Sequence, residues 1–306
     1  MRITGVGSLP HDDAAQAAAF VSATTDIAYL PQLPNRHPSE GMLRQWGDGL
    51  CGVGGVDEGI GLRFGAPEGD RAEAFGGAAA MLRAGTLEIV KTQVTGPLTI
   101  TLALLAAGAP RHGIWDCVVD GLSARLADHV ALIESEQPGA EIITVVDEPA
   151  LVMYAPHRDP GPIPVGEAAE GIARVLIDAP VPLGIHVCGD TDWRTVAGLR
   201  PAWLSWDLAA LGDGFLTATD ALAQIVSEGT GIMWGMVPTD PAPIDQDRVR
   251  SRYGTAVTRL VLEGAPIEAL ARDSLATPAC GLAGLSVGGA DAVMERLRAT
   301  VEALDG

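Results

Sequence analysis

The sequence predicts an α/β fold, a single-domain (β/α)8 TIM barrel that spans residues 1–306. Three observations predict it. Eight short apolar runs alternate along the chain with stretches of helical periodicity. The 306 residues are 47% hydrophobic, which is enough for one large core. Neither an internal repeat nor a low-complexity linker divides the chain, so we expect one domain.

The first quarter of the chain predicts two strands and one unusually long connection. Residues 2–10 should form a strand that stops in a Gly/Ser/Pro turn, followed by a capped helix over about 14–22. Residues 26–31 predict the second strand. The glycine-rich stretch over about 32–69 is too long for a simple connection, so we expect an excursion that acts as a lid over one end of the barrel.

The rest of the chain predicts six more strands and the helices that follow them. The clearest strand, over 141–149, is β-branched, then acidic, and is stopped by proline. The other strands are expected over 88–93, 183–188, 203–207, 231–237 and 274–280. Helices are expected over 68–83, 98–107, 115–136, 165–178, 191–198, 219–228, 246–263 and 290–304.

Charge and composition exclude several classes of function. The formal net charge of −19 argues against a nucleic-acid partner and against an anionic membrane surface. The longest apolar run, over 100–109, is too short to cross a bilayer, and no targeting segment opens the chain, so we expect a cytoplasmic protein. Cys51 and Cys117 belong to no pairing pattern, and we expect both to be ordinary small side chains.

A histidine and a cysteine two residues apart end the strand expected over 183–188. Alternate residues of a strand point to the same side, so His186 and Cys188 should face one point in space. An imidazole and a thiolate are half of a tetrahedral zinc site. Cys280 and Asp207, which also end strand-like runs, are the best candidates for the other half. The alternative is a buried histidine beside a buried cysteine.

Such a centre predicts a particular chemistry. Two thiolates and one imidazole leave the fourth zinc position to a carboxylate or to an incoming ligand. A thiol bound there would lose its proton more easily and would remain nucleophilic. The chemistry that suits this centre is transfer of an alkyl group onto sulfur.

Polar residues at two other strand ends predict a site for an amino-acid substrate. Asp147 and Glu148 could hold an ammonium group, although an acidic pair at a strand end can also be a solvated, capped loop. Ser8 and the amides around Gly7 could hold a carboxylate, although the same residues can form a plain turn. In a barrel, all of these strand ends open at the same face.

Five segments, in order along the chain, resemble the catalytic barrel of the cobalamin-independent methionine synthases, within the uroporphyrinogen-decarboxylase-like barrels. They are Val6-Gly7-Ser8-Leu9-Pro10, Thr95-Gly96-Pro97-Leu98-Thr99, Val146-Asp147-Glu148-Pro149-Ala150-Leu151, His186-Val187-Cys188 and Pro278-Ala279-Cys280-Gly281-Leu282. The resemblance implies that His186, Cys188 and Cys280 bind zinc, with Asp207 in place of a glutamate ligand. It also implies that Asp147 and Ser8 hold the amino and carboxylate groups of homocysteine. The implied reaction is methyl transfer from methyltetrahydrofolate to homocysteine, giving methionine.

The sequence departs from this family on the side of the methyl donor. The family's catalytic histidine after the seventh strand is replaced by Pro238-Thr239-Asp240, so we expect Asp240 to carry a proton. Glu40 is the nearest counterpart of the family's second amino-group carboxylate. The segment from His186 to Thr191 also resembles zinc methyltransferases that exchange methyl groups with corrinoids. Methylcobalamin, or a methyl-carrier protein as partner, is therefore the alternative donor. A barrel that binds zinc or an amino acid without catalysis is the further alternative.

Overall fold

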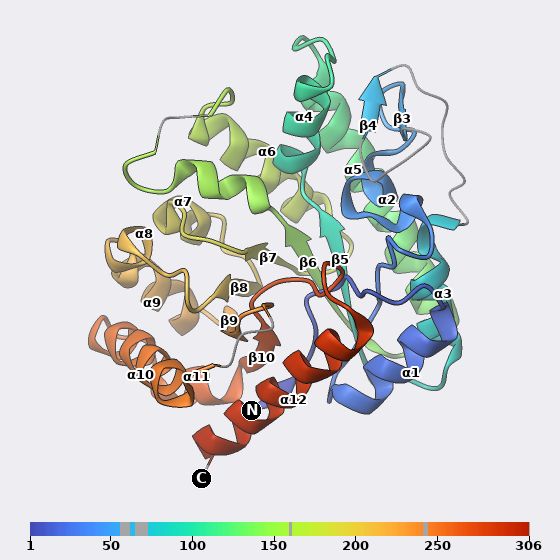
Figure 1. Cartoon of the computed structure of the whole chain (residues 1–306). Helices are drawn as coiled ribbons and strands as arrows, with labels where there is room; N and C mark the ends of the chain where they lie inside the picture. The colour runs from blue at the N-terminus through green and yellow to red at the C-terminus, as the bar shows by residue number, and fades with distance from the viewer. Residues whose placement is uncertain (56–61, 65–72, 159–160, 241–243, 306) are drawn as a thin grey trace.

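The computed structural model describes residues 1–55, 62–64, 73–158, 161–240 and 244–305, and within them eight parallel strands alternate with helices (Figure 1). The strand order is β1-β10-β9-β8-β7-β6-β5-β2, and every neighbouring pair is parallel. The strands are β1 (Arg2–Ile3), β2 (Ala28–Tyr29), β5 (Ile89–Thr95), β6 (Glu141–Asp147), β7 (Leu183–Val187), β8 (Trp203–Asp207), β9 (Gly231–Val237) and β10 (Ser274–Pro278). This arrangement is consistent with the predicted TIM barrel.

The helices lie around the outside of the strands (Figure 1). They are α1 (Ala14–Thr24), α2 (Met42–Gly47), α3 (Gly76–Arg83), α4 (Pro97–Ala106), α5 (Ile114–Glu136), α6 (Val165–Asp178), α7 (Trp193–Gly198), α8 (Asp213–Leu216), α9 (Thr219–Ser227), α10 (Gln246–Leu262), α11 (Ile267–Arg272) and α12 (Val287–Asp305). Three short 3₁₀ helices are η1 (Pro38–Glu40), η2 (Glu73–Phe75) and η3 (Pro149–Tyr154). None of the helices in the described ranges is long and apolar enough to cross a membrane.

A small apolar cluster shows that the sheet is curled. Val145 of β6 packs with Met233 of β9 and Leu275 of β10, although β7 and β8 separate these strands in the sheet order. Such side chains can meet only across the inside of a curved sheet. The larger apolar clusters lie between strands and helices, which is the layering of an α/β barrel.

The two ends of the sheet, β1 and β2, meet through local contacts rather than through a ladder. The main-chain N–H groups of Asp26 and Ile27 donate to the carbonyl of Ile3, at 2.9 and 3.0 Å. Further along, Ser8 and Gln32 form an isolated parallel bridge. We call this junction the seam, and define it as the contact between residues 2–9 and residues 26–32. The predicted strands over 2–10 and 26–31 are therefore shorter than expected.

The described part of the predicted excursion is held by buried polar contacts. Gln32 donates through Nε2 to Oε1 of Gln45 at 2.6 Å, and Gln45 donates to the carbonyl of Ala74 at 2.6 Å. A short antiparallel pair, β3 (Val53–Gly55) and β4 (Leu62–Phe64), belongs to the same stretch. Residues 56–61 and 65–69 of the predicted excursion lie outside the described residues. The same holds for residues 68–72 of the helix that was expected over 68–83.

The expectation for Cys51 and Cys117 was wrong, because the two form a disulfide bond. Cys51 follows α2 and Cys117 lies in α5, so the bond fastens the excursion to the outer helix layer. The partners are 66 residues apart in sequence. Their pairing depends on how the excursion packs against α5, which no local pattern reveals.

Candidate metal centre

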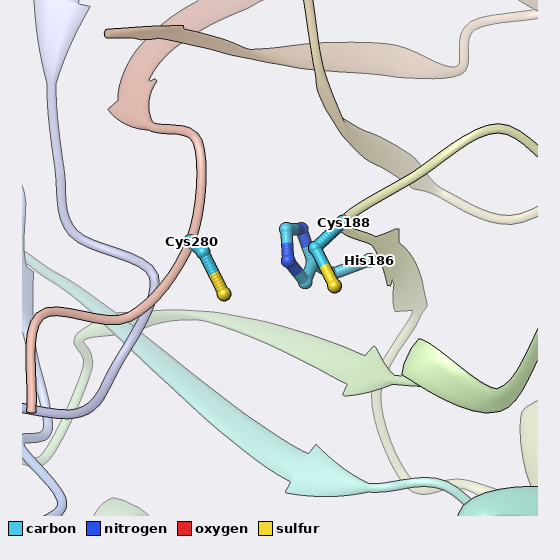
Figure 2. Close-up of side chains that lie close together, drawn as sticks. All are labelled: His186, Cys188 and Cys280. Atoms are coloured by element: carbon cyan, nitrogen blue, oxygen red, sulfur yellow. The ribbon is translucent and has the colours of Figure 1, made fainter. Parts of the chain in front are cut away.

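The ends of β7 and β10 bring one imidazole and two thiols together (Figure 2). His186 is the fourth residue of β7, Cys188 follows that strand directly, and Cys280 lies two residues beyond β10. One ligand atom from each of the three lies within 4.8 Å of the others. The spacing of His186 and Cys188 achieves this because alternate residues of an extended chain share a side. We call these three residues the His-Cys-Cys cluster.

The imidazole of His186 is fixed on one side and unpaired on the other. Its Nδ1 lies 2.8 Å from the hydroxyl of Ser205 on the neighbouring strand β8. Its Nε2 is buried and has no hydrogen-bond partner among the described residues. Leaving a buried polar atom unpaired costs about 1–3 kcal/mol. A metal ion on Nε2 would remove this cost, and one nitrogen with two sulfurs is a donor set that fits zinc.

The two cysteines interact with each other and with His186. The Cys188 thiol, which donates to Cys280, and the nearby charge of His186 lower the pKa of the Cys280 thiol. Donating the bond to Cys280, together with burial, raises the pKa of Cys188. Two thiolates this close repel each other, and a metal ion bound between them would stabilise both.

A cavity of 240 Å³ opens beside the His-Cys-Cys cluster. Its wall is mostly apolar, with few polar groups. It is lined by Val6, Ser8, Gln32, Pro34, Glu40, Gly41, Met42, Asp147, Pro149, His186, Cys188, Cys280, Gly281, Ala283 and Gly284. Gln32, Pro34, Glu40, Gly41 and Met42 come from the predicted excursion, so its described part lies at the mouth where the lid was expected. An apolar wall with a few polar groups is typical of a small-molecule site, and the volume suits a ligand smaller than a drug-sized one.

Asp147 lines this cavity and carries one unpaired carboxylate oxygen. It ends β6, opposite His186 in the register of β6 and β7, and is 8% exposed. Its Oδ1 is buried and has no partner among the described residues. Burial raises the pKa of Asp147, whereas the charges of His186 and Lys91 lower it. A ligand cation would satisfy the free oxygen.

Glu148 lies next to Asp147 in sequence but faces another way. Its carboxylate accepts hydrogen bonds from the amides of Leu98 and Thr99, at 2.8 and 2.9 Å, and from the Thr99 hydroxyl at 2.6 Å. It thus caps the N-terminus of α4 and does not line the cavity of 240 Å³. Burial raises its pKa to about 7. The structure therefore gives Glu148 a structural role at the start of α4, and its predicted role as a substrate ligand stays a prediction.

Gly96 allows the Glu148 carboxylate to lie where it does. A Cβ atom at Gly96 would be 2.2 Å from the carboxyl carbon of Glu148, closer than atoms can pack. The Gly-Pro pair of the sequence thus provides room for a carboxylate and then starts α4 with proline at its first position.

The two other predicted acidic residues lie outside the cluster. Asp207 ends β8, and its Oδ1 accepts the Ala209 amide at 2.7 Å. Burial raises its pKa, and the charge of Cys280 contributes. Asp240 lines a separate cavity of 270 Å³, bordered by Met236, Arg248 and Arg252. The structure thus brings neither carboxylate into the His-Cys-Cys cluster, and their predicted roles stay predictions.

Ser8 lies beside Cys280 at the cavity, as predicted from the barrel topology. Its carbonyl accepts the Leu282 amide at 2.8 Å, which joins the turn after β1 to the turn after β10. A Cβ atom at Gly281 would be 2.1 Å from the Ser8 hydroxyl oxygen. The glycine after Cys280 therefore lets the two turns approach closely. Glu40 also lines the cavity, but its carboxylate is paired with Arg36 and accepts the Gly77 amide at 3.0 Å.

The sequence interpretation missed Lys91, Gln93 and Ser205. All three are buried polar residues on strands, with exposed fractions of 2%, 3% and 3%. A signal was present in β5, where polar residues occupy positions 91, 93 and 95 and so line one face of the strand. A buried strand with a polar face predicts a polar barrel interior.

No protein-family model matches the chain, and no curated protein does. Solved structures do match. A B12-independent methionine synthase from Shewanella sp. W3-18-1, solved with selenomethionine, has a TM-score of 0.66 at 13% identity and covers 99% of this chain and 97% of its own. A candidate vitamin-B12-independent methionine synthase from Listeria monocytogenes scores 0.57 at 13% identity over 99% of this chain and 98% of its own. A methyltransferase from Methanosarcina mazei scores 0.55 at 12% identity over 97% and 94%. At this identity the similarity shows a shared fold.

Proposed function

We propose that this protein is a zinc-dependent methyltransferase that transfers a methyl group to the thiol of homocysteine, forming methionine. The observation that carries the proposal is the His-Cys-Cys cluster at the wall of a cavity that also holds Ser8 and Asp147. The fold is shared with B12-independent methionine synthases, one of them solved with selenomethionine, and with a methyltransferase, which supports the same reading. Fold similarity alone would not assign an activity.

Each residue of the cavity has a chemical task in this proposal. His186, Cys188 and Cys280 hold the metal ion, and Ser205 orients the imidazole from behind. Bound zinc lowers the pKa of a coordinated thiol and so supplies a thiolate nucleophile at neutral pH. The free oxygen of Asp147 accepts the substrate ammonium group, and Ser8 holds its carboxylate. The mostly apolar wall excludes water from the methyl group in transit.

The first experiment measures zinc content and thiol binding together. Wild-type protein purified without added metal should carry about one zinc per chain, and homocysteine should release a proton on binding. Cys280→Ala should lose most of the zinc, because it removes one of three ligands. A Cys51→Ala/Cys117→Ala double variant is the matched control, because it removes two sulfurs outside the cluster and should keep the metal. Metal-free wild type under reducing conditions would contradict the proposal.

The second experiment separates the methyl donors. Zinc-loaded protein with homocysteine is offered methyltetrahydrofolate or methylcobalamin, and methionine is measured by mass spectrometry. Transfer from either donor supports a methyltransferase and identifies its class. Zinc and thiol binding without transfer from either donor would instead favour a binding protein.

A further inference from the structure

We propose that Lys91 and Gln93 are positioning residues that hold the Val6–Ser8 segment in place as the carboxylate-binding wall of the cavity. The proposal rests on the proposed function only for the identity of the ligand. The positioning itself is carried by contacts inside the barrel that do not depend on any ligand.

Strand β5 presents its two faces to different surroundings. Thr92 faces outward, since its hydroxyl lies 2.9 Å from Nε2 of His129 on α5. Lys91 and Gln93 alternate with Thr92 and therefore point to the opposite side, toward the barrel interior. Lys91 is 2% exposed and Gln93 is 3% exposed, so both are buried inside the protein.

These two side chains reach both sides of the seam. The Lys91 ammonium donates to the carbonyl of Val6, on the β1 side. The Gln93 amide donates to the carbonyl of Leu30, on the β2 side, at 2.8 Å. Lys91 also lies 3.4 Å from Oε1 of Gln93, which couples the two. The pair thus joins the two sides of the seam between its main-chain hydrogen bonds at Ile3 and those at Gln32.

The Val6–Ser8 segment rests directly on Gln93. A Cβ atom at Gly7 would be 2.6 Å from the Gln93 amide carbon, so only glycine permits this approach. The carbonyl of Gly7 then accepts the Gln32 amide at 3.1 Å, and Leu9 donates back to Gln32 at 2.9 Å. With Gly7 seated on the interior side chain, Ser8 is placed at the cavity wall beside Cys280.

Burying the Lys91 ammonium carries a desolvation penalty that an apolar side chain would avoid. Burial lowers the pKa of Lys91 to about 8, and the charge of Asp147 offsets part of this effect. Methionine would occupy a similar volume without the desolvation penalty. The ammonium is explained by its bond to Val6, which an apolar side chain could not make.

The experiment compares Lys91→Met and Gln93→Leu with Thr92→Val. Thr92→Val is the matched control, because it also deletes a buried polar group of β5 but on the helix side. Hydrogen exchange of peptides covering residues 4–10 should accelerate in the first two variants and not in the control. Exchange of peptides covering residues 183–188 should be unchanged in all three. Unchanged exchange at residues 4–10 in both test variants would overturn the proposal, whatever the ligand.

A binding comparison then tests the role of the carboxylate wall. Zinc-loaded variants are titrated with homocysteine and with 3-aminopropanethiol, which lacks the carboxylate. Lys91→Met should bind homocysteine roughly tenfold more weakly and the analogue within about twofold of wild type. Equal weakening of both ligands would overturn the positioning role, since a general loss of structure does not distinguish them. Accelerated exchange with no homocysteine binding even in wild type would support the positioning role and contradict the proposed function.

Discussion

The hydrogen bond between Ser205 and His186 links the His-Cys-Cys cluster to the neighbouring strand β8. The distance of 2.8 Å and the burial of both groups fix the ring so that Nε2 faces the two sulfurs. Partners of this kind tune metal affinity even though they do not touch the metal.

Ser205→Ala should weaken zinc binding roughly tenfold and leave the fold intact. The reason is that the imidazole loses the contact that orients it. Competition with a chromogenic chelator measures the affinity. Ser274→Ala is the matched control, because Ser274 is also buried but bonds to the indole of Trp234 at 3.0 Å. Equal zinc affinity in Ser205→Ala and wild type would show that the bond has no orienting role.

Burial of the Glu148 carboxyl also makes the stability of the fold depend on pH. Its pKa is about 7 in the folded protein, above the ordinary value of 4.5, because the carboxyl is buried. Between these two values the folded state binds more protons than the unfolded state, so stability falls as pH rises. The free energy of unfolding of wild type should fall by roughly 3 kcal/mol more than that of Glu148→Gln between about pH 4.5 and pH 7. Urea denaturation at a series of pH values measures both slopes, and parallel slopes would contradict the prediction.

The sequence predicted the close approach of His186 and Cys188 because strand alternation is a local rule. It did not separate Asp147 from Glu148. Asp147 is the last residue of β6 and keeps the strand's alternation, whereas Glu148 has left the strand and turns to α4, far away in sequence. Which of two adjacent carboxylates enters the site therefore depends on where the strand stops.

At the scale of the element, the contact of α5 with α6 depends on one glycine. A Cβ atom at Gly171 of α6 would be 2.1 Å from the indole of Trp115 of α5. Gly166, in the first turn of the same helix, has open space around its Cα. Packing against Trp115 thus requires glycine at position 171, whereas no neighbouring atom requires it at position 166.

Gly171→Ala should destabilise the protein by about 1–3 kcal/mol, because the indole must move to make room. Gly166→Ala should stabilise it by up to about 1 kcal/mol, because alanine favours the helical backbone and meets nothing. Thermal or urea unfolding of the two variants, compared with wild type, gives both signs. A Gly171→Ala variant more stable than wild type would contradict this, because it would show that the indole can move aside without destabilising the protein.

Elements were predictable where they are long or strongly apolar. The strands β5 to β10 and the helices α4, α5 and α10 lie within a few residues of their predicted ranges. The helices α8 and α11, of 4 and 6 residues, were missed because they are too short to show a helical period. The N-terminal strands are shorter than predicted because residues 2–9 and 26–32 meet through separate hydrogen bonds and one isolated bridge rather than through a ladder.

At the scale of the whole molecule, the disulfide between Cys51 and Cys117 ties the described part of the excursion to α5. It closes a loop over 66 residues of sequence separation. A cross-link over such a loop restricts the unfolded chain and stabilises the fold. Disulfides of this kind are typical of oxidising compartments, and the expectation of a cytoplasmic protein stays a prediction.

Reducing agent should lower the free energy of unfolding of wild type by roughly 2–4 kcal/mol. The Cys51→Ala/Cys117→Ala double variant should not respond to reducing agent, which makes it the control. Urea unfolding with and without reductant measures the difference. Four titratable thiols in unreduced, zinc-free protein would contradict the bond.

The proposed metal centre also bears on the order in which the chain folds during its synthesis. His186 and Cys188 follow β7, whereas Cys280 follows β10, the last strand of the sheet to be made. A growing chain that has already folded its first strands would still lack the third ligand of the proposed metal centre until the segment after β10 has been made. In the proposed function, all three residues could hold the ion only after β10 has folded into the sheet, so bound metal would mark a chain whose sheet is assembled.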